Sequence, residues 1–247
     1  MYADFVAFTP RGDAVRWIDV AGDGGPVVYL HGLGCHGAAS WADAASRLGR
    51  RAILVDLPGH GRSDRPRTYD YSLPSLRDAV IAVVETVADG PVDLVGHSLG
   101  GTLAILIAAA RPDLVRRCVA VEPALDRRAI GAGDIAAWSE QDFLDRGWEL
   151  TLAGDPAWRR AEVRLTDPVA FLRCAIHTTD ALDDSITDLL LSVRVPTTLI
   201  RGEVRSYDRS DDIARTGIPE IVLAGAQHFV MLDRPEAFGR ELRAALA

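Results

Sequence analysis

The chain has 247 residues, of which 48% are hydrophobic and 25% are charged, and its formal net charge at pH 7 is -8. This composition predicts one large globular domain with an insertion, and the negative charge argues against a nucleic-acid partner, because phosphate binding needs a basic face. The chain has no secretion-signal pattern at its start and no apolar run of about 18 residues, so we expect a cytoplasmic protein without a membrane contact. The three cysteines lack the spacing of metal ligands, which predicts free thiols and no metal site.

The predicted elements begin with two short strands, residues 5–10 and 14–22, which pair antiparallel around a turn. Apolar runs typical of buried strands follow at residues 27–30, 52–55, 92–95, 115–121, 197–200 and 220–223. Helical patterns at residues 75–87 and 99–110 lie between these runs, and Pro112 ends the second helix. Strands that alternate with helices predict an α/β fold, in which a mostly parallel central sheet has helices on both faces and binds ligands at the carboxyl ends of its strands.

Between residues 123 and 195 this alternation stops, and the pattern is helical. We therefore predict that residues 123–195 form an inserted helical cap over the strand ends, and that residues 1–122 and 196–247 form the core domain. Because the pocket for a small molecule is mostly apolar, large apolar side chains of the cap are expected to line it. The candidate pocket residues are Trp138, Phe143, Trp148 and Phe171.

A serine lies between two glycines where the predicted strand at residues 92–95 ends and the helix at residues 99–110 begins. Residues 96–100 are GHSLG and match the pattern G-x-S-x-G, in which a serine occupies a sharp turn from strand to helix. The two glycines allow the neighbouring backbone to come close, and the helix N-terminus stabilises a developing anion. Ser98 is therefore the predicted nucleophile.

A serine nucleophile also needs hydrogen-bond donors for the oxyanion and a base that accepts its proton. The glycine-rich turn at residues 31–34 can direct the backbone N–H of Leu33 toward the same point as the N–H of Leu99, and these two groups are the predicted oxyanion hole. His228 is the predicted base, because it follows the last predicted strand and precedes the C-terminal helix. Four other histidines lie in strand-end loops and are expected to shape those loops. They are His31, His36, His60 and His97.

Four motifs occur along the chain in the order HGLG (31–34), DLPGHGRSD (56–64), GHSLGG (96–101) and GAQHFVMLDRPEAF (225–238). Through these motifs the chain resembles the α/β-hydrolase fold superfamily over nearly its whole length. The resemblance implies a central sheet of about eight strands, a cap inserted after the sixth strand, and neither a metal nor an organic cofactor. It also implies ester-type acyl transfer through an acyl-enzyme, and a loop at residues 56–64 that is mostly structural and borders the pocket.

The chain departs from this family at the acid that orients the histidine. The family usually has an aspartate shortly after the seventh strand, where this chain has Arg205. We predict that Glu122 takes the role, because it follows the strand at residues 115–121, which a right-handed crossover makes the parallel neighbour of the nucleophile's strand. Asp208 is the alternative acid, and Glu203 lies so close to its strand that its side chain is expected to point away.

Together these residues predict a serine hydrolase that cleaves a small ester, lactone or thioester, with a small molecule as its substrate. Two alternatives remain open. One is a non-catalytic ligand-binding protein of the same fold, and the other is a serine-dependent reaction on another bond, as in C–C bond hydrolases, lyases or haloperoxidases. A covalent label on Ser98 separates the enzymes from the binding protein.

Overall fold

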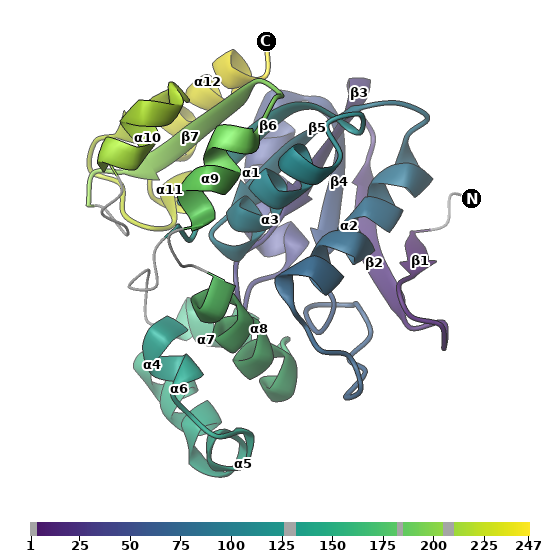
Figure 1. The fold of residues 1–247 in the computed structure, drawn as a ribbon, viewed down its shortest axis with the longest axis vertical. Coiled ribbons are helices and arrows are strands. Elements are labelled where there is room, and N and C mark those ends of the chain that lie inside the picture. The colour runs from purple at the N-terminus through teal and green to yellow at the C-terminus, as the bar shows by residue number, and fades with distance from the viewer. Residues whose placement is uncertain (1–3, 126–131, 182–184, 205–209) are drawn as a thin grey trace.

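The computed structural model of the chain describes residues 4–125, 132–181, 185–204 and 210–247. Within them one sheet of eight strands has the order β1-β2-β4-β3-β5-β6-β7-β8 (Figure 1). The strands are β1 (Phe5–Ala7), β2 (Ala14–Val20), β3 (Asp23–Leu30), β4 (Arg50–Asp56), β5 (Val92–His97), β6 (Val115–Val121), β7 (Thr197–Gly202) and β8 (Glu220–Leu223). β2 pairs antiparallel with β1 and with β4, and the other neighbouring strands are parallel. The predicted α/β fold with a mostly parallel sheet is confirmed.

Helices cover both faces of this sheet (Figure 1). They are α1 (Gly37–Leu48), α2 (Leu73–Val87), α3 (Leu99–Ala110), α9 (Ser185–Ser192), α10 (Ser210–Thr216), α11 (Val230–Asp233) and α12 (Pro235–Ala245). Successive side chains of a strand point to opposite faces, so a fully buried strand needs apolar residues in a continuous run. In β3, Tyr29 packs with Trp41 of α1 on one face, whereas Val28 belongs to the core cluster of α2 and α3 on the other.

The remaining helices form a separate lobe beyond one end of the sheet (Figure 1). They are α4 (Ala132–Ala136), α5 (Glu140–Asp142), the π-helical turn Phe143–Gly147, α6 (Trp148–Gly154), α7 (Ala157–Val163) and α8 (Pro168–Ala181). We call these elements the helical lobe. Its own core is a cluster in which Phe143, Leu152, Val163 and Leu172 are fully or almost fully buried.

Helix α9 lies within residues 123–195, the range predicted for the cap, but it packs on the sheet. Leu190 of α9 shares a core cluster with Ile105 of α3 and Leu199 of β7. The part of the range that stands apart from the sheet is therefore the helical lobe, and the role of the whole range as a cap stays a prediction.

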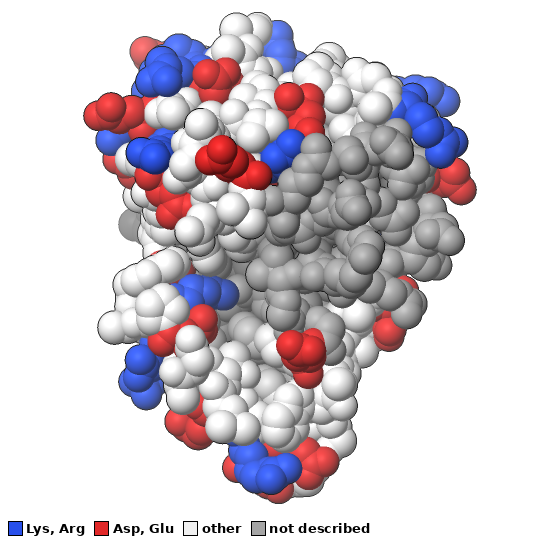
Figure 2. All heavy atoms as spheres, turned by 90° about the vertical axis from the view of Figure 1, so that its left-hand side faces the viewer, with Lys and Arg blue, Asp and Glu red and all other residues white. Residues whose placement is uncertain are grey.

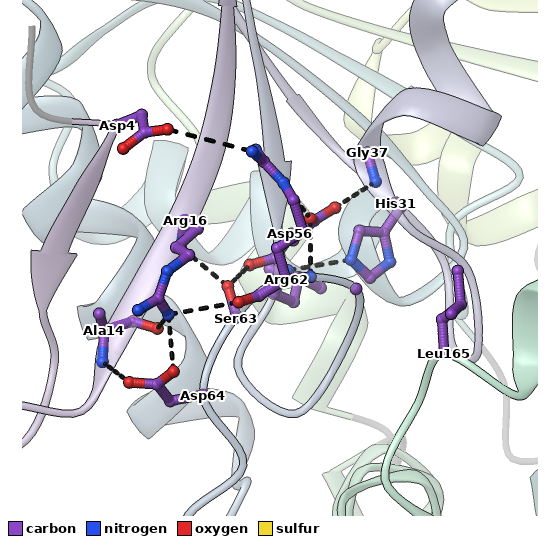
Figure 3. Close-up of polar contacts among 12 residues, drawn as sticks. Asp4, Ala14, Arg16, His31, Gly37, Asp56, Arg62, Ser63, Asp64 and Leu165 are labelled. Atoms are coloured by element: carbon purple, nitrogen blue, oxygen red, sulfur yellow. Dashed lines mark hydrogen bonds and ion pairs between the residues drawn. The ribbon is translucent and has the colours of Figure 1, made fainter.

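The loop after β4 contacts helix α1 and the helical lobe, and Figure 3 shows its contact with the start of α1. The Asp56 carboxylate accepts the backbone N–H of Gly37 at 2.8 Å and that of Arg62 at 3.0 Å, so it links the start of α1 to this loop. The Arg65 guanidinium donates to the Leu165 carbonyl oxygen of the helical lobe at 2.8 Å. This loop is structural, as the family resemblance implies.

Acidic and basic side chains are interspersed on the face that Figure 2 shows, and its described residues form no extended basic patch there. Among the described residues, no helix has both the length and the apolar character needed to cross a membrane.

Candidate active site

Ser98 lies on a strained turn between β5 and α3. Its φ is 52° and its ψ is -119°, a backbone conformation that costs a non-glycine residue about 1–3 kcal/mol. A Cβ atom on Gly96 would overlap the Gly100 carbonyl oxygen, and one on Gly100 would lie 2.6 Å from the carbonyl oxygen of His31. Both glycines are therefore required by close backbone contacts. The Ser98 N–H donates to the Val121 carbonyl oxygen at 2.9 Å, which joins this turn to the end of β6.

Glu122 and His228 come together beside this turn. The Glu122 side chain is fully buried, and its Oε1 accepts the Gly202 N–H at 2.6 Å while its Oε2 lies 3.6 Å from Nδ1 of His228. The last distance is slightly longer than a normal hydrogen bond. A Cβ atom on Gly202 would lie 2.5 Å from the Ala226 carbonyl oxygen, so this glycine lets the loop before His228 approach the carboxylate.

The other two candidate acids are placed differently. Asp208 lies outside the described residues. The Glu203 carboxylate accepts the Gly225 N–H at 2.9 Å at an exposed position.

His97 contacts the loop that carries His228, which we call the histidine loop. Its Nε2 is 2.9 Å from the His228 carbonyl oxygen, and the two imidazole rings are 4.6 Å apart. Complete burial lowers the pKa of His97 well below its ordinary value, so the ring is neutral. A carbonyl oxygen can only accept, so Nε2 carries the proton and donates. His97 was expected to shape the loop in which it lies, but it is the last residue of β5 and its ring contacts the loop that carries His228.

The turn at residues 31–34 is held by the buried imidazole of His31. Its Nδ1–H donates to the Gly32 carbonyl oxygen at 2.8 Å, and its Nε2 accepts the Leu57 N–H at 2.9 Å. Burial lowers the pKa of His31 to about 3, so the ring stays neutral in this bridging arrangement. Because the N–H of a trans peptide is opposite its C=O, the Leu33 N–H points away from His31.

This turn is also close to the nucleophile. A Cβ atom on Gly32 would lie 3.2 Å from the Cβ of Ser98. Helix α3 begins at Leu99, and the first N–H groups of a helix have no acceptor within the helix. The N–H groups of Leu33 and Leu99 are therefore both available beside Ser98.

Ser98 and His228 line one cavity of about 310 Å³ between the sheet and the helical lobe. Phe171 lines this cavity, as predicted. Trp138, Phe143 and Trp148 are not among its lining residues. They pack within the lobe, where the rings of Phe143 and Phe171 are stacked 6.3 Å apart and Trp148 lies edge-on to Phe171. The loop at residues 56–64 also contributes no lining residue.

The cavity also has polar walls that the sequence did not indicate. The helical lobe contributes Thr151, Asp155, Arg159 and Thr178. Burial raises the pKa of Asp155, although the positive charge of Arg159 opposes this shift. Arg159 donates to the backbone of residues 33–34. These positions have no motif, because their approach to Ser98 depends on how the lobe packs on the sheet.

A larger and more open depression of about 1230 Å³ lies at the amino ends of the parallel strands. Its walls include Gly22, Arg51, Pro91 and Arg116, and none of the predicted site residues. Ligands of parallel α/β sheets bind at the carboxyl ends of the strands, where Ser98 is. The smaller cavity is therefore the candidate active site.

Comparisons with known proteins agree with this architecture. Residues 27–241 match the model of the alpha/beta hydrolase family. The chain is 30% identical over 269 residues to an esterase of Mycobacterium tuberculosis, covering 94% of this chain and 85% of the relative. It is 29% identical over 239 residues to a 2-(acetamidomethylene)succinate hydrolase of Mesorhizobium japonicum, covering 87% of this chain and 85% of that protein.

Solved structures show the same fold. An enol-lactonase from Burkholderia xenovorans LB400 superposes with a TM-score of 0.74 at 21% identity, over 95% of this chain and 97% of that one. An E-2-(acetamidomethylene)succinate hydrolase superposes with a TM-score of 0.72 at 25% identity, over 98% and 97% of the two chains. The family match spans most of the sequence, and the sheet order and the turn at Ser98 agree with it, so the chain belongs to the α/β-hydrolase family and is a hydrolase of that fold.

Proposed function

We propose that the chain is a serine hydrolase that cleaves a small ester, lactone or thioester through an acyl-enzyme on Ser98. One observation carries the proposal: Ser98 on its strained turn lines the same cavity as His228, whose Nδ1 is 3.6 Å from the buried carboxylate of Glu122. This is the arrangement of nucleophile, base and orienting acid that acyl transfer requires.

In the first half of the reaction, Ser98 Oγ attacks the carbonyl carbon of the substrate while His228 Nε2 takes the hydroxyl proton. The carbonyl oxygen becomes an oxyanion, which the backbone N–H groups of Leu33 and Leu99 bind. The bond to the leaving oxygen or sulfur then breaks, and His228 donates its proton to that atom. Glu122 accepts the Nδ1–H of the imidazole and offsets the positive charge that develops on it.

In the second half, water replaces the leaving group. His228 takes a proton from the water as its oxygen attacks the acyl carbon, and a second oxyanion forms on the same two donors. The bond between the acyl carbon and Ser98 Oγ breaks, and the proton returns to Ser98 through His228. A carboxylic acid leaves, and the free enzyme is restored.

The size and the lining of the cavity support a preference for a small, uncharged acyl group. Its volume of about 310 Å³ is at the lower end of the range for ligand pockets, and Leu33, Phe171 and Phe229 form apolar walls. The two charged lining residues, Asp155 and Arg159, have opposite signs, so the cavity has no excess positive charge to attract a carboxylate. One relative is named as a hydrolase of a substituted succinate. We propose that this chain instead prefers neutral esters or lactones.

The test is labelling with an alkyl fluorophosphonate and peptide mass analysis, together with turnover of p-nitrophenyl esters from acetate to octanoate. We expect a label on Ser98 and highest kcat/KM for short neutral acyl groups, with a p-nitrophenyl hemisuccinate much slower than the butyrate ester. The Ser98→Ala protein is the control and should lose both the label and turnover. A folded wild-type protein that takes no label would favour the non-catalytic binding protein, and a label without turnover of esters, lactones or thioesters would favour a reaction on another bond.

A further inference from the structure

Arg159, in helix α7 of the helical lobe, reaches across to the loop after β3. Its Nη2 donates to the Leu33 carbonyl oxygen at 2.5 Å, and its Nη1 donates to the Gly34 carbonyl oxygen at 2.6 Å. The same Nη1 lies 3.2 Å from Cys35 Sγ. One guanidinium from the lobe thus contacts three consecutive residues of the loop that carries the Leu33 N–H, with the planar donor geometry that lysine lacks.

We define the oxyanion loop as residues 31–35. On the side of the sheet, its Gly32 carbonyl oxygen accepts from Nδ1 of His31 and from the Cys35 N–H. On the side of the lobe, the next two carbonyl oxygens accept from Arg159. The peptide that carries the Leu33 N–H is therefore held on one side through its Gly32 carbonyl oxygen, and Arg159 holds the two peptides that follow it, so Leu33 is fixed from both of its ends.

The backbone of this loop needs such support at Gly34. This residue has a φ of +68°, and glycine reaches positive and negative φ with similar ease, so the peptide plane between Leu33 and Gly34, which carries the Leu33 carbonyl oxygen, can turn through the φ of Gly34 at little steric cost. The Phe171 ring lies 2.7 Å from where a Gly34 Cβ would be, so the lobe packs directly on this turn. Removal of the guanidinium would leave two carbonyl oxygens beneath the lobe without their donor.

Arg159 also contacts the loop that carries the base. Its guanidinium carbon is 5.5 Å from the centroid of the Phe229 ring, the residue after His228, and Trp158 lies edge-on to the same ring at 5.3 Å. A cation over the face of an aromatic ring is attracted by the negative charge of that face, so this contact is favourable. The single side chain therefore joins the helical lobe to both loops beside Ser98.

We propose that Arg159 is a positioning residue for the oxyanion hole: from the helical lobe it orients the oxyanion loop so that the Leu33 N–H is directed at the developing oxyanion. This proposal rests on the proposed serine hydrolase function. Under this proposal, the transition state is stabilised only when the helical lobe packs correctly on the oxyanion loop. The binding of the ground-state ester depends instead on the apolar cavity walls.

Loss of one oxyanion donor lowers kcat by about 10²–10³-fold in serine hydrolases. Because Arg159→Gln would misorient the Leu33 N–H and leave the Leu99 N–H in place, we expect kcat to fall about 10- to 100-fold with KM changed less than about threefold. Arg159→Lys keeps the charge but cannot span two carbonyl oxygens, so its kcat should lie between those of Arg159→Gln and the wild type.

The experiment measures kcat and KM for p-nitrophenyl butyrate, the rate of Ser98 phosphonylation by the fluorophosphonate, and the thermal midpoint. Arg164→Ala is the matched control, because Arg164 is an exposed arginine directly after α7. In Arg159→Ala, millimolar methylguanidinium should restore part of the lost kcat, because the vacated space and the two carbonyl oxygens remain. The same additive should not change the kcat of Arg164→Ala.

Either of the following kinds of result would overturn the proposal while leaving the serine hydrolase function intact. One is a wild-type rate of phosphonylation and kcat in Arg159→Gln. The other is a loss that appears only in KM, or a kcat loss that Arg164→Ala reproduces with the same fall in the thermal midpoint. If the wild-type protein itself fails to react at Ser98, the proposed function fails first, so the two failures are distinguishable.

Discussion

The two turns that meet at Ser98 are held in different ways. In the turn at residues 96–101, the glycines permit close backbone contacts: a Cβ atom on Gly96 would overlap the Gly100 carbonyl oxygen, and one on Gly100 would meet the backbone of Leu30 and His31. In the oxyanion loop at residues 31–35, groups distant in sequence hold the backbone, since Leu57 binds the imidazole of His31 and Arg159 binds the loop carbonyl oxygens. The first turn depends on the sterics of its own glycines, and we call it locally determined in this sense, whereas the second depends on side chains from distant segments.

This difference separates two ways of building one site. A locally determined turn tolerates side-chain changes elsewhere in the molecule, because the close contacts of Gly96 and Gly100 are with backbone atoms. A loop held by distant side chains responds to the packing of the sheet and the helical lobe. The histidine loop is of the second kind, since His228 depends on Glu122 and His97, which lie in other segments.

The largest loss of activity is expected from changing Glu122, which lies beside His228, the proposed base. Glu122→Gln removes the charge that opposes the imidazolium and leaves an amide that can hold the wrong tautomer, so we expect kcat to fall about 10²–10⁴-fold. The fold and KM should change little, because Gln keeps an oxygen for the Gly202 N–H. Steady-state kinetics and circular dichroism measure the two properties.

The comparison for this prediction is Asp208→Asn, the alternative acid. Glu122 is expected to carry the function, so Asp208→Asn should keep kcat within about threefold of the wild type. A large loss of kcat in Asp208→Asn with a near-normal Glu122→Gln would assign the role to Asp208 instead.

The locally determined parts could be predicted from the sequence. The turn at residues 96–100 was recognised because both glycines that its close backbone contacts require lie within that pattern. The position of Glu122 beside His228 followed from topology, since a right-handed crossover makes β6 the parallel neighbour of β5. The strands from β3 to β8 were indicated by apolar runs of a length typical of a buried sheet.

The parts that depend on tertiary contacts could not be predicted. Arg159 is one of several arginines in a helical pattern, and only the packing of the lobe brings it to the oxyanion loop. Large apolar residues of the lobe were expected in the pocket, but apolar character does not distinguish the core of a lobe from the wall of a cavity, and Phe143 belongs to the former. Helix α1 was not predicted, because small residues dominate it and Trp41 and Leu48 are its only large buried side chains.

Acidification should destabilise the folded protein through three buried histidines, two of which make the tertiary contacts described above. His31, His60 and His97 are fully buried, and burial lowers the pKa of His31 and His60 to about 3 and that of His97 well below its ordinary value. In the unfolded chain each histidine has a pKa near 6.5, so below about pH 6 the unfolded chain binds more protons than the folded one. The free energy of unfolding should therefore fall as the pH falls toward 4, with a slope of up to about 4 kcal/mol per pH unit, a factor of about 10³.

Denaturant unfolding measured from pH 7 to pH 4.5 tests this slope. His60→Asn keeps a donor for the Pro58 carbonyl oxygen that His60 Nδ1 contacts at 3.0 Å, and it should reduce the slope by about one third. His177→Asn, in the helical lobe, is the matched control. An unchanged slope in His60→Asn would show that other groups cause the acid sensitivity.

A smaller effect is expected from breaking the locally determined turn. Gly100→Ala places a Cβ against the carbonyl oxygens of Leu30 and His31, so the turn must shift, and we expect a loss of about 1–3 kcal/mol in the free energy of unfolding. Ser98 should also react more slowly with the fluorophosphonate. Gly154→Ala is the control, because no atom lies within 4 Å of its added Cβ. Equal stability and labelling rates in both variants would contradict the local steric explanation.

The smallest effect concerns the wall of the cavity. Phe171 lines the cavity, so Phe171→Leu should enlarge the space for the acyl chain and shift the ratio of kcat/KM for octanoate over acetate esters by about tenfold toward octanoate. Phe143→Leu is the matched control, since Phe143 stacks on Phe171 but does not line the cavity, and it should lower stability without changing this ratio. If both variants changed the ratio equally, the aromatic cluster would act on selectivity through the packing of the lobe and not through the surface of the cavity.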